Sequence, residues 1–197
     1  MKRIFDLTAA LLGLISLFPI FLVIGILIKL KDKGPVFFRQ VRVGRYGKLF
    51  ILYKFRSMRM IEYASKGLFE PGNLSRCNSF GRFLRRTKLD ELPQLYNVLI
   101  GDMSLVGPRP EVEKWVAFYP ERWNKILSVS PGMTDNASIE FRNEELLLSE
   151  SKEPEKTYLE VILPKKLELN ETYLANKSFF GDLKLIFKTI FLIVNNK

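Results

Sequence analysis

The first thirty residues carry a long apolar segment. The run LTAALLGLISLFPIFLVIGILI, residues 7–28, contains no charged side chain. As one straight helix it would extend about 33 Å, which is enough to cross the hydrocarbon layer of a bilayer. Pro19 lies near its middle and removes a backbone hydrogen bond, so a kink or a break is expected there. The basic residues that flank the run are Lys2, Arg3, Lys29, Lys31 and Lys33.

These flanks bear on how the segment meets a membrane. Basic residues beside a membrane segment favour the cytoplasmic side, and here both flanks are basic. A helix that bends at Pro19 and returns to the side it entered satisfies that preference. A kinked span is the alternative, because proline is tolerated in spanning helices, and these residues alone leave the two equally open. The segment does not resemble a signal peptide, since it is too long and no small-residue cleavage site follows it.

Two strand-like runs follow the apolar segment. PVFFRQVR and LFILYKFR are rich in aromatic and β-branched residues, and VGRYGK lies between them with Gly44 and Gly47. This pattern predicts a β-hairpin. Lys54 and Arg56 share one face of the second strand, which these residues alone predict to be a solvated face. Residues 59–78 carry Gly, Ser and Asn with little periodicity and predict a loop.

Two adjacent carboxylates, Asp90 and Glu91, stand between a cationic segment and a proline. A helical pattern begins at Phe80, and Pro93 is well placed as the first residue of a second helix, PQLYNVLIGDM. The carboxylates would then lie at the entrance of that helix, where backbone N–H groups favour negative charge. We expect both to be held ionised by the helix terminus and by nearby cations, while helix capping with surface ion pairs is the alternative that spacing alone favours. The cations are Arg82, Arg85, Arg86 and Lys88.

Arg109 is flanked by Pro108 and Pro110 in the segment GDMSLVGPRPEV. Both prolines restrict φ, which gives the arginine a preset direction. Such a guanidinium suits bidentate recognition of a phosphate, whereas a tight surface turn is the alternative interpretation.

The C-terminal run SFFGDLKLIFKTIFLIVNNK is amphipathic at helical spacing. Its stripe either packs on the core or lies in the membrane interface, and the aromatic residues with the flanking Lys184 and Lys188 favour the interface. The residues of the stripe are Leu183, Ile186, Phe187, Ile190, Phe191 and Val194.

Composition limits the chemistry that the chain can perform. The 197 residues suit one domain, and a net charge of +10 predicts anionic partners such as nucleic acid, an anionic membrane surface or phosphorylated small molecules. Histidine is absent and Cys77 is the single cysteine. These counts exclude Ser-His and Cys-His nucleophile pairs, a tetrahedral zinc site and an internal disulfide. Carboxylates, Lys, Arg, Tyr or hydroxyls must therefore perform any catalysis.

Four segments together resemble those of the bacterial sugar transferases, the small monotopic phosphoglycosyl transferases. They are KRIFDLTAALLGLISLFPIFLVIGILIK, GPVFFRQVRVGRYGKLFILYKFRSM, LRRTKLDELPQLYNVLIGDMSLVGPRPEV and SPGMTDNASIEFRNEE. The resemblance covers nearly the whole chain, and its most specific block is DELPQL followed by GDMSLVGPRP. It implies an α+β, mainly helical fold with a re-entrant membrane helix broken at Pro19, a small β-hairpin, catalytic helices and a C-terminal amphipathic interfacial helix. Residues 1–30 would form the membrane helix and residues 31–197 the cytosolic catalytic domain.

The resemblance also implies an activity and its residues. The family transfers a sugar-1-phosphate from a UDP-sugar to polyprenyl (undecaprenyl) phosphate in the inner leaflet, at the cytoplasmic face of the bacterial inner membrane, and releases UMP. Asp90 matches the nucleophile that forms an aspartyl-phosphosugar intermediate, and Glu91 would orient the site or handle a proton. Mg²⁺ is the implied cofactor, with Asp90 as its ligand. Arg109 and Arg142 match phosphate or nucleotide contacts, and Lys54 matches a position near the site.

Two segments depart from the family pattern. The Ser-Pro of its helix break reads Phe18-Pro19 here, and DNASIEFR follows Thr134 where GL-QV-GR is common, which bears on the sugar that is accepted.

The alternative to an enzyme is a basic peripheral membrane or nucleic-acid-binding protein without catalysis. Nucleic acid is not expected as a partner, because the basic residues do not gather in one patch and no known binding motif is present. A family member without activity is a third possibility, against which the intact Asp90-Glu91 pair argues. The residues predict neither the donor sugar nor the oligomeric state.

Overall fold

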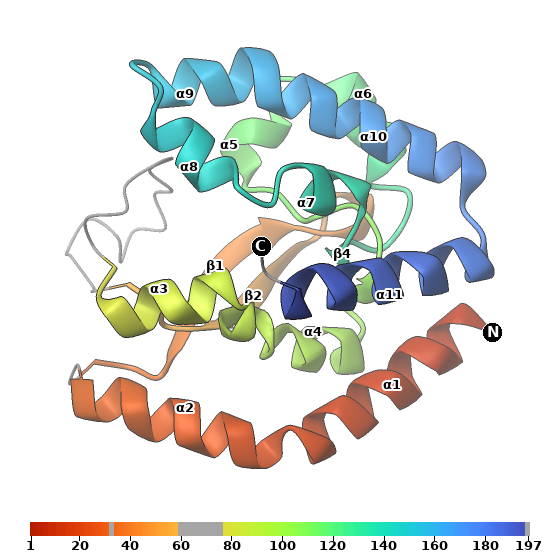
Figure 1. Ribbon diagram of the computed structural model, residues 1–197. Helices are drawn as coiled ribbons and strands as arrows, with labels where there is room; N and C mark the ends of the chain where they lie inside the picture. Colours follow the sequence, from red (N-terminus) through yellow and green to blue (C-terminus); the bar gives the residue numbers. More distant parts are fainter. Residues whose placement is uncertain (32–33, 59–76, 196–197) are drawn as a thin grey trace.

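The computed structural model describes residues 1–31, 34–58 and 77–195 as a mainly helical α+β fold (Figure 1), as predicted. Of the loop predicted for residues 59–78, residues 59–76 lie outside the described residues. The helices are α1 (Lys2–Ser16), α2 (Phe18–Lys31), α3 (Ser79–Arg86), α4 (Gln94–Ile100), α5 (Glu113–Val116), α6 (Pro120–Ile126), α7 (Asn136–Glu140), α8 (Glu144–Ser149), α9 (Pro154–Thr157), α10 (Leu163–Asn176) and α11 (Phe179–Val194). A short π-helical turn, Tyr158–Ile162, joins α9 to α10.

In the part of the chain that the structure describes, two small sheets lie between the helices. Strands β1 (Phe37–Val43) and β2 (Leu49–Phe55) form the predicted antiparallel hairpin. Gly47 has φ +75° in the connecting loop, which suits a glycine because it lacks a Cβ. Strands β3 (Ser104–Val106) and β4 (Gly132–Thr134) pair in parallel and bring two distant loops of the chain together.

The two N-terminal helices meet at a bend of 59°, which confirms the predicted break. Helix α1 ends at Ser16, and Pro19 lies in the first turn of α2, where its missing N–H leaves no helical bond unmade. Among the described residues, no single helix is long and apolar enough to cross a membrane, whereas this bent pair together has the necessary length and composition. Re-entry of the pair into a membrane stays a prediction.

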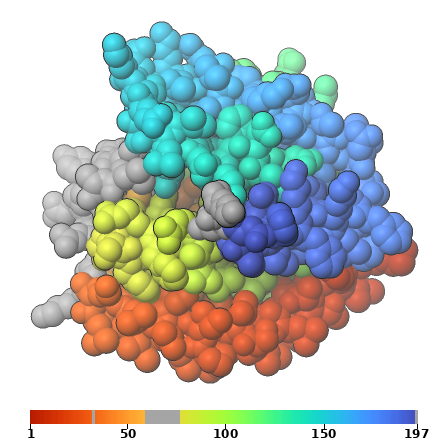
Figure 2. Space-filling view, in the orientation of Figure 1, coloured from red at the N-terminus to blue at the C-terminus, as the bar shows by residue number. Residues whose placement is uncertain are grey.

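The helix pair packs against the body through one side and leaves the other open. Ala10 of α1 belongs to a core cluster with Leu95 and Val98 of α4, and Ile24 of α2 packs with Phe55 of β2. In Figures 1 and 2 the pair forms the lower surface of the molecule. A large exposed apolar surface of this kind marks a membrane or protein contact. Its exposed apolar residues are Ile4, Leu11, Leu12, Ile15, Phe18, Ile20, Leu22, Val23, Ile26 and Leu30.

Polar contacts fix the start of α1 to the rest of the fold. Asp6 is buried and accepts from Ser104 Oγ at 2.8 Å. Lys2 Nζ donates to the Val106 carbonyl at 3.0 Å and pairs with Asp182 of α11. Tyr173 of α10 donates to the same Asp182 carboxylate at 2.9 Å. The first helix is therefore held to β3 and α11.

The C-terminal helix divides its apolar residues between the core and the surface. Leu185 is buried, while most of the predicted stripe (Phe187, Ile190, Phe191 and Val194) is exposed. Packing on the core and an exposed stripe therefore coexist on α11, because they occupy different sides of the helix. Contact of the stripe with a membrane interface stays a prediction.

Candidate active site

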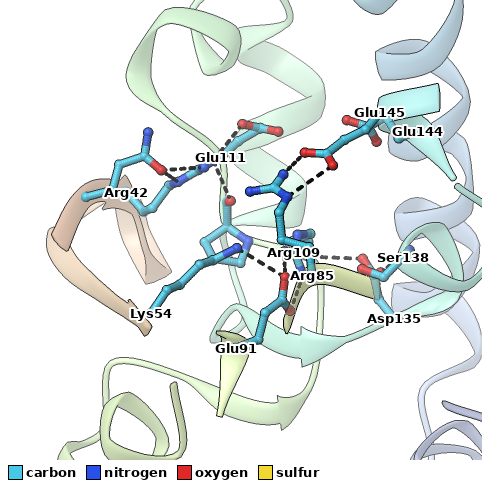
Figure 3. A network of polar contacts seen from close by, with 12 residues as sticks. Arg42, Lys54, Arg85, Glu91, Arg109, Glu111, Asp135, Ser138, Glu144 and Glu145 are labelled. Carbon is cyan, nitrogen blue, oxygen red and sulfur yellow. Dashed lines mark hydrogen bonds and ion pairs between the residues drawn. The ribbon is translucent and has the colours of Figure 1, made fainter. Parts of the chain in front are cut away.

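Glu91 is the centre of a buried ion-pair network formed by three distant segments. Arg109 donates two hydrogen bonds to its carboxylate, at 3.1 and 2.5 Å, and Lys54 Nζ of β2 donates one at 3.1 Å (Figure 3). Burial by itself would raise the pKa of Glu91, but Arg109 and Lys54 outweigh it and hold the pKa well below its usual value. The structure thus brings together three of the residues that the sequence singled out.

Asp90 lies beside Glu91 in a short 3₁₀ turn, Leu89–Glu91, and has a different environment. It is 3% exposed, and its Oδ1 has no hydrogen-bond partner among the described residues. Burial raises the pKa of Asp90 although Lys54 opposes the shift. Cations therefore lower the pKa of Glu91, as expected, whereas burial outweighs them at Asp90 and raises its pKa. The expected ionisation of Asp90 stays a prediction.

The local backbone differs from the predicted helix entrance in one respect. Helix α4 begins at Gln94, one residue after Pro93, and the two carboxylates lie in the preceding 3₁₀ turn rather than in the first turn of the helix. Lys88 enters that turn with φ +56°, and α4 ends at Gly101 with φ +104°. The cations that pair with Glu91 come from β2 and from the Pro-Arg-Pro segment, not from the preceding basic helix α3.

Arg109 is held by its backbone as well as by its side chain. Its N–H donates to Asp135 Oδ2 at 2.9 Å, and Asp135 also caps α7 through the Ser138 N–H. The neighbouring Gly107 and Gly132 lie so close that a Cβ on Gly132 would approach the Gly107 nitrogen to 2.1 Å. Glu91 raises the pKa of Arg109, so the guanidinium is a permanent cation. The interpretation as a surface turn is wrong, because this arginine forms a two-pronged ion pair in the site.

Lys54 lies on the inner face of the hairpin. Its side chain is 19% exposed and faces Glu91, so the predicted solvated face is wrong for this residue. Arg56, two residues further, is buried. Burial lowers the pKa of Lys54 to about 8, although Glu91 opposes the shift.

A second buried network supports the arginine turn and was missed in the sequence. Arg42 of β1 donates to the Pro110 carbonyl at 3.2 Å and to Glu111 Oε2 at 3.0 Å. Gln40 accepts from Arg42 at 2.7 Å, and the Tyr158 hydroxyl donates to Glu111. Gln40, Arg42 and Lys54 occupy one face of the hairpin, and this alternation of polar residues was the available signal.

Helix α8 contributes two carboxylates to the region around Arg109 (Figure 3). Glu145 pairs with Arg85 of α3, and Glu144 pairs with Lys166 of α10. Arg142 lies half-buried in the turn that joins α7 to α8, close in sequence to both carboxylates. Its predicted contact with phosphate or nucleotide stays a prediction.

The sequence model of the family described as bacterial sugar transferase matches residues 1–196 of this chain. The chain belongs to this family. It is 42% identical over 190 residues to "Uncharacterized sugar transferase EpsL" of Bacillus subtilis (strain 168), covering 96% of this chain and 85% of the relative. It is 38% identical over 204 residues to a "UDP-glucose:undecaprenyl-phosphate glucose-1-phosphate transferase" of Klebsiella pneumoniae, covering 100% of this chain and 40% of the relative. This sugar transferase therefore spans most of the first relative and less than half of the second.

A third relative matches a shorter part of this sugar transferase. It is the "Putative undecaprenyl-phosphate N-acetylgalactosaminyl 1-phosphate transferase" of Bacillus subtilis (strain 168), 48% identical over 110 residues, which cover 56% of this chain and 62% of the relative. The sugar named differs between the second and third relatives, whereas undecaprenyl phosphate is named for both.

Proposed function

We propose that this chain transfers a sugar-1-phosphate from a UDP-sugar to undecaprenyl phosphate and releases UMP, with Asp90 as the nucleophile. The observation that carries the proposal is the dyad: Asp90 is buried with an unpartnered oxygen, next to a Glu91 that is locked between two cations. The names of the second and third relatives support these substrates, since both name undecaprenyl phosphate and the transfer of a sugar 1-phosphate, and the second also names UDP-glucose.

The reaction proceeds through two displacements at one phosphorus. A carboxylate oxygen of Asp90 attacks the phosphorus that bears the sugar, the new O–P bond forms, and the bond to the UMP oxygen breaks. A phosphate oxygen of the polyprenyl acceptor then attacks the same phosphorus, and the bond to Asp90 breaks. The carboxylate is regenerated, and the sugar-1-phosphate is now joined to the lipid phosphate.

The electrostatics of the dyad assign different tasks to its two carboxylates. The pKa of Glu91 is held well below its usual value, so this group is a weak base and serves to orient Arg109 and Lys54. Lys54 acts on Asp90 as well as on Glu91, and in the proposed reaction it reduces the repulsion between the Asp90 carboxylate and the incoming diphosphate. Of the two roles that the resemblance leaves open for Glu91, the geometry supports orientation.

The residues present fit a magnesium ion at Asp90. The described residues include no group of three or more acidic, Cys or His side chains that could hold a metal alone. Both oxygens of Glu91 are bonded to Arg109 or Lys54, whereas Asp90 pairs with no cation among the described residues. One carboxylate with substrate phosphates and water is a usual ligand set for Mg²⁺. Asp90 would therefore hold the ion, which supplies charge neutralisation of the diphosphate when bound.

The exposed apolar surfaces support a proposed membrane arrangement. We place the bent pair α1–α2 in the cytoplasmic leaflet as a re-entrant element, with residues 31–197 as the catalytic domain and the exposed stripe of α11 in the interface. A monotopic enzyme of this kind acts at the cytoplasmic face of the inner membrane, where its polyprenyl acceptor is embedded.

A donor panel tests the activity. Detergent-solubilised protein with Mg²⁺ and undecaprenyl phosphate is incubated with UDP-glucose, UDP-galactose or UDP-N-acetylgalactosamine, and UMP release is measured. Intact mass without acceptor should show a phosphosugar adduct, which Asp90→Asn should abolish together with turnover. Asp102→Asn, a carboxylate that follows α4 and accepts from Asn97 rather than from the site cations, is the matched control and should keep both. Full turnover of Asp90→Asn, or tight binding of nucleic acid without UMP release from any donor, would refute the proposal.

A further inference from the structure

Gln94, one helical turn after Asp90, is a second buried residue with an unused hydrogen-bonding atom. Gln94 is 1% exposed, and its side-chain Nε2 has no hydrogen-bond partner among the described residues. Asp90 Oδ1 is in the same condition. A buried polar atom without a partner costs about 1–3 kcal/mol, and native proteins keep few of them. A donor and an acceptor left unused within one turn therefore point to a bond that forms during function.

The backbone keeps these two side chains about one turn apart on one continuous helical path. Leu92 (φ −52°, ψ −36°) and Pro93 (φ −61°, ψ −15°) are both right-handed helical, so the 3₁₀ turn continues into α4 without a reversal. The rise is about 2.0 Å per residue in a 3₁₀ turn and about 1.5 Å in an α-helix, so four residues advance roughly 6–8 Å along the axis. The side chains of a glutamine and an aspartate together span such a distance, so rotation about their torsions can bring the amide to the carboxylate of Asp90.

We propose that Gln94 is a positioning residue for the nucleophile. Resting on the proposed role of Asp90, the inference is that the Gln94 amide donates a hydrogen bond to Asp90 Oδ1 when the UDP-sugar is bound. Oδ1 is buried away from solvent, so in this proposal it accepts from Gln94 and Oδ2 is the attacking atom. Fixing one oxygen of a carboxylate fixes the direction of the other, which places Oδ2 for attack.

A neutral donor can orient the carboxylate without itself neutralising it, which leaves the negative charge of Asp90 available to the magnesium ion and to the phosphorus. An amide orients the group with a smaller effect on its charge. The sequence places cations on Glu91 and an amide after Asp90, which separates orientation of the nucleophile from neutralisation of the substrate.

Asn97 provides a matched comparison on the same helix. It is fully buried, and both ends of its amide are used: Nδ2 donates to the Ile51 carbonyl at 2.7 Å, and Oδ1 accepts from the Tyr53 N–H at 3.1 Å. Asn97 is thus a structural amide that joins α4 to β2. Gln94 lacks such bonds, so its removal should affect chemistry rather than stability.

The test compares Gln94→Met with Asn97→Met in the full-length, detergent-solubilised protein. The probe is whichever of UDP-glucose, UDP-galactose or UDP-N-acetylgalactosamine gives most UMP. Gln94→Met should slow single-turnover adduct formation and kcat about tenfold, because a hydrogen bond to a charged group is lost. KM for the donor should stay within about twofold and the melting temperature should not fall, since an unused buried amide is replaced by an apolar side chain of similar size. Asn97→Met should lower the melting temperature instead.

The outcomes separate this inference from the proposed function. An unchanged rate of adduct formation in Gln94→Met overturns the positioning role, while loss of the adduct in Asp90→Asn still upholds the nucleophile. Loss of the folded state in Gln94→Met would also overturn it, because the amide would then be a structural requirement. Turnover by Asp90→Asn would remove the basis of both.

Discussion

Replacement of Glu91 by Gln tests whether this carboxylate orients cations or handles a proton. The change keeps the shape of the side chain and removes its negative charge. Arg109 and Lys54 then remain in a buried region without their common anion, and the new amide can accept from only one oxygen where the carboxylate accepted three bonds. We expect loss of stability and a displaced pH profile rather than simple loss of a base.

The magnitude follows from burial and from the pKa of Lys54. The Glu91 side chain is 12% exposed, and breaking a buried ion pair by removing one partner costs about 3–5 kcal/mol. For a chain of this size, that corresponds to a fall of roughly 6–20 °C in melting temperature. Burial lowers the pKa of Lys54 to about 8 while Glu91 opposes the shift, so removal of Glu91 lowers it further. The nearby Arg109, Asp90 and Arg42 act on the same ammonium and are unchanged in the variant.

The sign of the pH effect is then fixed. Lys54 is cationic below its pKa and neutral above it, so activity that needs the cation should fall in the wild type as the pH rises through about 8. In Glu91→Gln this alkaline fall should begin at lower pH. The assay is UMP release between pH 6 and 9 with melting curves at each pH, and Glu113→Gln, an exposed carboxylate on α5, is the control. The orientation role would be refuted by two results together: the activity of Glu91→Gln falls at the same alkaline pH as that of the wild type, and an added base such as imidazole restores the activity that the variant has lost. Glu91 would then transfer a proton.

Three further predictions concern other parts of the molecule. Arg109→Lys should lower turnover about tenfold or more, measured as UMP release, because a lysine cannot form the two-pronged bond to Glu91; unaltered turnover would contradict it. Pro19→Ala should straighten the α1–α2 bend and place some molecules across the membrane, so that labels at the two ends of the pair report opposite sides; same-side labelling of every molecule would exclude the proline as the cause. Phe187→Glu with Phe191→Glu should weaken binding to anionic vesicles without lowering the melting temperature, since both side chains are exposed; unchanged sedimentation with vesicles would count against an interfacial α11.

The elements that local patterns determine were predictable from the sequence. The break at Pro19, the hairpin around Gly47 and the amphipathic α11 each depend on residues within one turn or one hairpin. The basic helix was also placed correctly, as α3 begins at Ser79, one residue from the predicted start at Phe80. These features need no knowledge of what the segments pack against.

The composition of the site was less predictable because its bonds are long-range. Glu91 is bonded to residues 37 and 18 positions away, so neighbouring basic residues in the sequence were misleading. The polar face of the hairpin reads as solvated until Arg42 and Lys54 are seen to face the Pro-Arg-Pro segment. The raised pKa of Asp90 is a consequence of burial by tertiary packing, which no local pattern reports.

Adjacency of the two carboxylates is what makes their division of tasks possible. In a 3₁₀ turn successive side chains point about 120° apart, so neighbours in sequence face different surroundings. Glu91 faces Lys54 and Arg109, while Asp90 faces a sealed environment in which one oxygen has no partner. Their pKa values are displaced in opposite directions as a result. Glu91 can therefore fix the cations that a diphosphate needs, while Asp90 remains a carboxylate that forms no ion pair with them. Pairs of acids whose pKa values are displaced in opposite directions are the usual mark of distinct catalytic roles.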